Sequence, residues 1–299
     1  MTIFEHPRVR AGLLSVLLLL LLLAVWQVAT LPRSGGSVAP PAAALTAEQI
    51  EYARLMGKDP GGEGGGAATA TAKSGFPTPA QMGRAIAQHL SDPFYDNGPN
   101  DKGVVLQLLY SLGRVALGYL IAAAVAIPLG FVIGMSPLVH RALDPFIQVL
   151  KPISPLAWMP LALYTIQDSH RSGIFVIFIC SVWPMLINTA FGVAGVRREL
   201  LNVARTLEVS PLRKAFEVIL PAAAPTILTG MRISMSIAWL VIVAAEMLVG
   251  GTGIGYFVWN EWNNLSLPNV IFAILLIGVV GMVLDMGFAR LQKAVTYVE

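Results

Sequence analysis

The sequence is poor in charge and in cysteine, and each shortage excludes a class of protein. Only 12% of the 299 residues are charged, whereas 56% are hydrophobic and the mean hydropathy is +0.69. Soluble domains carry about 25% charged residues, so a lipid bilayer is favoured as the main solvent of this chain. The one cysteine, Cys180, lies in an apolar run, which excludes an intrachain disulfide and a thiol pair for metal or redox chemistry.

Enzymatic signatures are missing too. The one Gly-Lys pair, Gly57-Lys58, lacks an upstream glycine at the spacing of a phosphate-binding loop, so the chain is not expected to hydrolyse ATP itself. The four histidines show no metal-ligand spacing, and no Gly-x-Ser-x-Gly elbow occurs. The sequence therefore predicts no catalytic residues, no cofactor and no metal. The net charge of +3 comes from short loops rather than from a basic stripe with aromatics, so no nucleic-acid partner is expected.

Long apolar runs are what the sequence has instead. A helix needs about 20 apolar residues to cross the hydrocarbon core, and six stretches come close to that length. They are residues 11–31, 115–135, 145–166, 173–196, 226–250 and 270–288. Lys151 and three prolines interrupt the third stretch, but a proline-broken helix is tolerated where neighbouring helices satisfy its backbone. The predicted fold class is an all-α integral membrane protein with six transmembrane helices.

Small residues recur at four-residue spacing in the second stretch, at Gly118, Ala122, Ala126 and Gly130. Such a stripe lets two helix backbones approach closely, so we expect tight helix packing there.

Arginine and lysine concentrate in alternate loops, which predicts the orientation. The basic loops and termini hold Arg8, Arg10, Arg141, Arg197, Arg198, Arg205, Arg213, Lys214, Arg290 and Lys293. Residues 251–267 hold neither Lys nor Arg, and residues 167–172 hold only Arg171. The positive-inside rule therefore predicts a multi-pass membrane protein with both termini cytoplasmic. Residues 8–31 also fit a secretory signal peptide, whose removal would leave five spans in the same orientation.

We expect four parts along the chain. Residues 1–31 form the first transmembrane helix, residues 32–113 a periplasmic linker and surface helix, residues 114–290 the transmembrane core, and residues 291–299 a cytoplasmic tail. The linker begins with Pro/Gly/Ala-rich sequence that includes residues 61–66. The surface helix is predicted over residues 78–90, with Met82, Ile86 and Leu90 on one face.

The largest basic loop, residues 197–225, reads RRELLNVARTLEVSPLRKAFEVILPAAAP and contains two short amphipathic segments. Leu200, Val203, Ala204 and Leu207 line one face of this loop, and Ala215, Phe216 and Ile219 line another. Apolar faces of this kind are stabilised by burial, so we expect this loop to dock on a partner protein.

The loop resembles that of ABC importer permeases, whose pattern is Glu-Ala-Ala, three residues, Gly, nine residues, Ile-x-Leu-Pro. Here Asn202, Val203 and Ala204 hold the first three positions, Glu208 the glycine position, Val218 the isoleucine position, and Leu220 and Pro221 the end. Glutamate resists the positive φ that glycine permits, which leaves the turn geometry open. In that family the loop forms coupling helices in a groove of the ATPase subunit. The resemblance thereby assigns coupling to Leu200, Asn202, Val203, Ala204, Arg205, Leu207, Glu208, Ser210, Leu220 and Pro221.

Further blocks resemble the nitrate/sulfonate/taurine permease family in order and spacing. They are SLGRVALGYLIAAAVAIPLGFVIG, ALDPFIQVLKPISPLAWMPLAL, SGIFVIFICSVWPMLINTAFGV and MRISMSIAWLVIVAAEMLVGGTGIGYFVW. DPFYDNGPNDKG and GIGYFVWNEWNN resemble the nitrate/bicarbonate branch. The resemblance implies a type I ABC importer permease fold with cytoplasmic coupling helices, a translocation path for a small oxyanion, and nitrate or nitrite as its cargo. Bicarbonate, cyanate and sulfonate or taurine are the alternatives within the family.

The resemblance also implies partners. They are two ABC ATPase subunits, a second permease copy in a homodimer, a periplasmic or lipid-anchored substrate-binding protein, and membrane lipid. A secondary anion transporter is the alternative outside the family, but it would need more ionisable groups at mid-membrane than this sequence supplies.

Five side chains are candidates for the translocation path: Glu246, Asn188, Arg114, Trp158 and Met159. Glu246 is the one ionisable residue well within a predicted span, which predicts either a gating role or a structural hydrogen bond. Arg114 could attract an incoming anion or anchor its helix at the lipid headgroups.

Overall fold

The computed structural model describes residues 7–30, 76–98 and 101–295, which are helical apart from turns and one isolated bridge between Asp96 and Lys102. The chain forms two compact units, Met1–Gly83 and Arg84–Glu299. Each is described by itself.

The first unit contains one long apolar helix, α1 (Pro7–Thr30), where the first transmembrane stretch was predicted. Its leucines are exposed, as suits a helix solvated by lipid. The Trp26 indole N–H donates to Pro77 O at 3.0 Å, and its ring meets Phe76 edge-on. Most of the predicted linker, residues 32–75, lies outside the described residues.

Helix α3 (Pro79–Ser91) begins in the first unit and ends in the second, close to the predicted surface helix. A reciprocal pair caps its start, because Thr78 N donates to Gln81 Oε1 and Gln81 N donates to Thr78 Oγ1. The predicted apolar face is wrong at its end: Leu90 is 56% exposed. His89 is turned inward instead, stacked on Phe272 and edge-on to Phe257.

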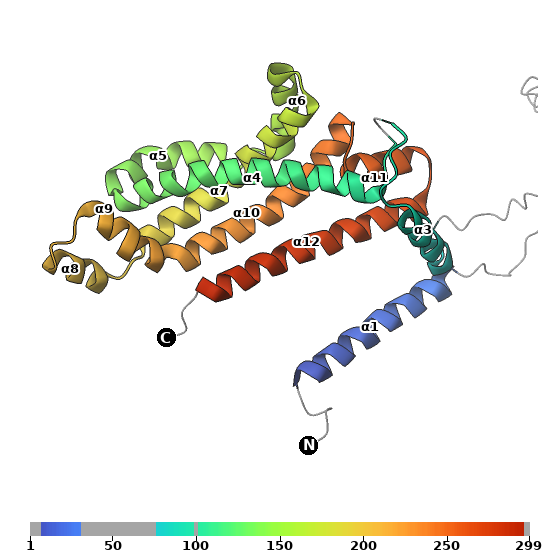
Figure 1. The fold of residues 1–299 in the computed structure, drawn as a ribbon, viewed down its shortest axis with the longest axis horizontal. Helices are drawn as coiled ribbons and strands as arrows, with labels where there is room; N and C mark the ends of the chain where they lie inside the picture. Colours follow the sequence, from blue (N-terminus) through green and yellow to red (C-terminus); the bar gives the residue numbers. More distant parts are fainter. Residues whose placement is uncertain (1–6, 31–75, 99–100, 296–299) are drawn as a thin grey trace, which may run out of the picture. The chain divides into compact units, whose positions relative to one another are not determined.

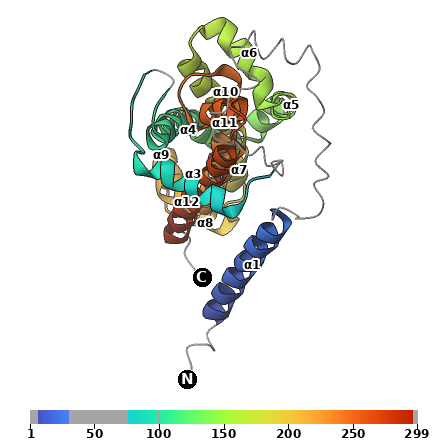
Figure 2. The same ribbon diagram turned by 90° about the vertical axis from the view of Figure 1, so that its right-hand side faces the viewer.

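Four long helices run side by side through the second unit: α4 (Val104–Met135), α7 (Ser169–Ala194), α10 (Leu220–Val249) and α12 (Leu267–Val295) (Figure 1). Helix α7 packs against both α4 and α10, and α10 packs against α12 (Figure 2). Helix α4 begins at Val104, well before the predicted span at residue 115 and the predicted core at residue 114. Gln107, Ser111 and Arg114 interrupt the apolar run in the sequence, but all three are buried within the fold.

Close packing of α4 on α7 follows the small-residue stripe, as the sequence predicts. A Cβ added at Gly118 would lie 2.8 Å from Ile174 O, and one added at Gly130 would lie 2.7 Å from Leu186 O. Ala122 and Ala126 are fully buried between these glycines. The stripe therefore brings two helix backbones into direct contact.

The third predicted span is not one helix. Residues 137–166 form α5 (Pro137–Leu150) and α6 (Pro155–Ile166), which meet at an angle of 89°. Pro152 lacks a backbone donor, and Pro155 disfavours helical geometry at Ser154 before it, so the helix ends and restarts. In the described ranges, five helices are long and apolar enough to cross a membrane, or six if this bent pair counts as one span.

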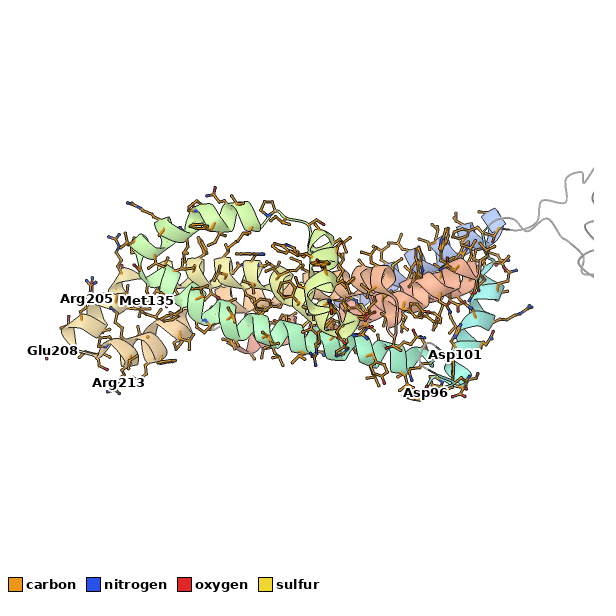
Figure 3. All side chains as sticks on the ribbon, turned by 90° about the horizontal axis from the view of Figure 1, so that it is seen from above. Asp96, Asp101, Met135, Arg205, Glu208 and Arg213 are labelled. Carbon is orange, nitrogen blue, oxygen red and sulfur yellow. The ribbon has the colours of Figure 1, made fainter. Side chains whose placement is uncertain are left out.

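The two ends of the long helices carry different elements (Figures 1 and 3). One end, called here the α8 end, holds α8 (Arg198–Thr206), α9 (Pro211–Lys214) and a π-helical segment (Ala215–Ile219). The opposite end, called the α11 end, holds α11 (Ile254–Asn263). In Figure 3, Arg205, Glu208 and Arg213 lie at the α8 end, and Asp96 and Asp101 lie at the α11 end.

Candidate functional site

A buried ion pair lies near the α11 end. Arg114 of α4 and Glu246 of α10 are 9% and 4% exposed, and Arg114 Nη1 donates to Glu246 Oε1 at 2.7 Å. The Ser111 hydroxyl, one turn before Arg114, lies 2.9 and 2.8 Å from the two oxygens of the same carboxylate. A buried charge is unfavourable unless it is paired and hydrogen-bonded, so these three side chains, named here the polar cluster, stabilise one another.

The loop after α10, residues 250–253, is attached to the polar cluster. Arg114 Nη1 donates to Thr252 O at 2.5 Å, and the Gly255 amide donates to Glu246 Oε2 at 3.0 Å. Gly253 has a φ of +147°, and a Cβ there would overlap the Glu246 carboxyl group. Glycine is therefore required at this close approach. The cluster joins α4, α10 and the start of α11.

A pocket of about 250 Å³ lies beside the polar cluster, and Arg114, Met159, Asp168, His170 and Glu246 are part of its wall. Arg114 Nε donates to His170 Nδ1 at 2.9 Å, so the guanidinium already serves a carboxylate, a carbonyl and an imidazole. An anion in this pocket would meet no unengaged positive charge from Arg114 and would face two carboxyl groups. The geometry suits a contact that holds helices together better than an anion-binding site.

The remaining path candidates lie elsewhere. Trp158 lines a separate cavity at the break between α5 and α6. The Asn188 amide donates to Pro184 O at 2.8 Å, and its Cβ packs close to Gly230. Asn188 therefore satisfies a backbone carbonyl within α7 and lies at the contact between α7 and α10.

The sequence analysis predicted Arg114, Glu246 and Met159 as candidates for the translocation path, but it did not predict the contacts around them. The expectation that Arg114 anchors its helix in the headgroup layer is wrong, because its guanidinium is buried against Glu246. Ser111, His170 and Thr252 were not predicted as site residues. Ser111 and Glu246 are 135 positions apart, and no local pattern signals a pair at that separation.

The loop at the α8 end presents apolar side chains to solvent. Val203, Leu207, Leu212 and Phe216 are 58%, 69%, 75% and 67% exposed, and Leu200 is 43% exposed. Ala204 and Ile219 are only 3% exposed, so they are covered by this chain itself. The prediction that Ala204 belongs to an outward docking face is therefore wrong. Its small side chain instead faces the chain's own core, while Val203 and Leu207 face outward.

The turn after α8 keeps the geometry of a glycine although glutamate stands there. Glu208 has a φ of +51°. Glu208 N donates to Arg205 O and Val209 N donates to Ala204 O, at 3.0 and 3.1 Å. These two bonds form a Schellman motif, which satisfies the last carbonyls of the helix. Ser210 and Pro211 then start α9.

Long helices, a bent pair and a loop of short amphipathic helices at one end define a membrane component of a transporter. Residues 126–297 match the family described as binding-protein-dependent transport system inner membrane component. The chain is 45% identical over 226 residues to the nitrate import permease protein NrtB of Synechocystis sp., which covers 76% of this chain and 82% of that protein. It is 47% identical over 204 residues to the bicarbonate transport system permease protein CmpB of the same organism, which covers 68% and 73%.

Among solved structures, the inward-facing MetNI methionine ABC transporter matches with a TM-score of 0.59 at 13% identity, over 65% of this chain and 96% of that chain. The fold is that of a type I ABC importer permease. The chain belongs to the family of binding-protein-dependent transport system inner membrane components. It is a multi-pass transport subunit rather than an enzyme, which confirms the family resemblance read from the sequence.

Proposed function

We propose that the chain is the permease subunit of an ATP-driven importer for a small oxyanion, with nitrate or nitrite as the cargo. The observation that carries this proposal is the identity of 45% and 47% to nitrate import permeases of Synechocystis sp. and Leptolyngbya laminosa. Bicarbonate is the second candidate, because the bicarbonate permease of Synechocystis sp. is 47% identical.

The working complex holds two copies of this permease, two ATPase subunits and a substrate-binding protein. The exposed apolar side chains of the α8 end support an ATPase docking surface, since monomeric soluble faces rarely leave so many large apolar groups uncovered. The binding protein meets the opposite end, from which cargo enters. ATP-driven approach of the two ATPases moves the coupling loops, and the long helices reorient.

The polar cluster acts as the gate in this scheme. It fastens the loop of residues 250–253 to α4, so releasing Glu246 from Arg114 frees that loop to move. A bistable contact of this type can switch between two discrete arrangements when the helices shift. Glu246 serves the gate and does not contact the anion, because two negative charges repel.

The membrane is the bacterial inner membrane, with both termini and the α8 end in the cytoplasm. Arg197, Arg198, Arg205, Arg213 and Lys214 cluster at the α8 end, whereas residues 251–267 at the opposite end hold no Lys or Arg. This asymmetry supports the orientation through the positive-inside rule.

Uptake by the reconstituted complex tests the cargo. Proteoliposomes with the permease, its ATPases and its binding protein are given labelled nitrate, nitrite or bicarbonate with and without ATP. We expect ATP-dependent nitrate or nitrite uptake that excess bicarbonate does not suppress. Bicarbonate uptake without nitrate or nitrite uptake would reverse the assignment, and uptake of none of them would reject the proposed function.

A further inference from the structure

A second cavity, of about 240 Å³, lies where the bent pair breaks. Lys151 follows the last residue of α5 and Trp158 belongs to α6, while Cys180 and Trp183 come from α7 and Ile237 from α10. Helix α5 has 14 residues, so at 1.5 Å per residue it is about 21 Å long. Figure 1 shows the break between α5 and α6 about half way along α4. Lys151, directly after α5, therefore follows about 21 Å of helix that begins near the α8 end.

The Lys151 side chain is exposed in the single chain, and its charge is unbalanced at this site. Among the described residues its ammonium group has no hydrogen-bond or ion-pair partner, and no carboxyl group lines the cavity. A lysine within the hydrocarbon core of a membrane is unfavourable unless it faces water, a counter-charge or a ligand. The polar cluster near the α11 end shows the contrast, because there the buried Arg114 has Glu246 as its counter-charge.

Two tryptophans, Trp158 and Trp183, line the same cavity. Within the described ranges, the indole N–H groups of Trp26 and Trp239 donate to the carbonyls of Pro77 and Ile277, both at 3.0 Å. Those of Trp158 and Trp183 have no such acceptor there. Indole and ammonium groups can only donate hydrogen bonds, so the polar groups of these three lining side chains are all donors, and no acidic side chain lines the cavity.

We propose that this cavity is a binding station for the transported anion, with Lys151 as its positive charge and the indoles of Trp158 and Trp183 as further donors. The identity of the cargo rests on the proposed function. A small oxyanion with its charge spread over several oxygens is the ligand that such donors fit. One water occupies about 30 Å³ in the liquid, so about 240 Å³ holds such an anion with part of its hydration shell.

Lys151 also belongs to the wall of a third cavity, of about 530 Å³, which lies between α4, α5 and α7. His140 and Asp144 line that cavity nearer the start of α5, which follows Met135 at the α8 end. An anion is bound more weakly beside the Asp144 carboxyl group than in the cavity that has Lys151 alone.

The first test is uptake of labelled nitrate by proteoliposomes containing Lys151→Gln. We expect at least a tenfold fall in uptake, with normal membrane insertion, ATPase co-purification and basal ATP hydrolysis. Lys151→Arg should restore most of the uptake because it restores the charge. Lys293→Gln is the matched control, since Lys293 lies near the end of α12 and lines none of the three cavities. Normal uptake by Lys151→Gln would overturn the inference while leaving the proposed function intact.

The second test does not depend on transport. In a Cys180→Ala background, Lys151→Cys is exposed to an anionic, water-soluble thiol reagent in membrane vesicles. We expect labelling that nitrate slows, because the cavity is hydrated and binds anions. A thiol that stays unlabelled, or is labelled at a rate that nitrate does not change, would overturn the binding station. If the unmodified complex takes up no nitrate, the proposed function fails separately. Slower labelling of Lys151→Cys in the presence of bicarbonate or chloride would then still support an anion-binding station, and unchanged labelling would reject it.

Discussion

At the scale of single residues, Glu246 is fixed more completely than any other acidic side chain in the described part of the chain. It accepts hydrogen bonds from Ser111, Arg114 and Gly255 while 4% exposed. Glu246→Gln keeps the size but leaves Arg114 buried without a counter-charge. Because breaking a buried pair costs about 3 kcal/mol or more, we expect a clear loss of thermal stability and of substrate uptake.

Asp96→Asn is the control for this prediction. The hydrogen bond from Lys102 holds the pKa of Asp96 below its ordinary value, so Asp96 is ionised at neutral pH. Its side chain is 52% exposed, however, and water screens such pairs. We expect no measurable change in unfolding temperature for this variant. A Glu246→Gln protein that matched the control in both stability and uptake would show that the polar cluster has no gating role.

Glu208 is a second residue at which substitutions should change stability, because its backbone has a positive φ. Its φ of +51° is unfavourable for a residue with a Cβ, whereas glycine adopts it freely. We expect Glu208→Gly to raise the stability of the purified permease by about 1 kcal/mol and Glu208→Val to lower it by at least as much. Thermal unfolding followed by circular dichroism measures both. Equal stability of the two variants would mean that the turn relaxes out of the left-handed region.

At the scale of elements, the contact of α4 with α7 depends on glycine. Gly130→Ala would place a Cβ 2.7 Å from Leu186 O, so the helices must separate, and we expect a loss of about 1–3 kcal/mol. Gly113→Ala lies on the same helix with nothing within 4 Å of the added Cβ. That control should be neutral or slightly stabilising, because alanine is the better helix former. Unfolding temperatures in detergent compare the two, and equal values would contradict direct backbone contact.

Two positions in the loop at the α8 end should respond differently to substitution, one through docking of the ATPase and the other through folding of the permease. Leu207 is 69% exposed, so Leu207→Asp should leave the permease folded but prevent co-purification of the ATPase subunits. Ala204 is 3% exposed within this chain, so Ala204→Asp should destabilise the permease itself by several kcal/mol. Membrane yield and co-purification, measured for both, distinguish the two effects.

Leu265→Asp is the control for that docking test. Leu265 is 86% exposed beyond α11, and its φ of +54° is one that aspartate tolerates. Co-purification should be normal for this variant. ATPase binding that survives Leu207→Asp would remove Leu207 from the docking surface.

At the scale of the whole molecule, the two ends should face different compartments. Glu208 lies at the α8 end and Asp101 at the α11 end (Figure 3). In a Cys180→Ala background, Glu208→Cys should react with a membrane-impermeant thiol reagent only in inverted vesicles, and Asp101→Cys only in intact spheroplasts. The reverse pattern would contradict cytoplasmic placement of the coupling loop, and with it the direction proposed for transport.

Much of this molecule was predictable because membrane proteins are constrained by their solvent. A chain in lipid must satisfy its backbone hydrogen bonds internally, so apolar run lengths give the helices directly. The small-residue stripe on α4 and the family of the chain were predicted in the same way, from local spacing and motif. Lys151 and its neighbouring prolines marked the third stretch as unusual, but their spacing did not give the 89° angle between α5 and α6.

The sequence by itself determined the helices, the class of transporter and which side chains were unusual for a membrane. Only the tertiary structure decided what those side chains do. It joined Glu246 to Ser111 and Arg114 across more than 130 positions, turned Ala204 inward and gave Lys151 no ion-pair partner among the residues that it describes. Helix formation depends on residues three or four positions apart, whereas the pairing of charges depends on which helices pack together, and no periodicity in the chain records that choice.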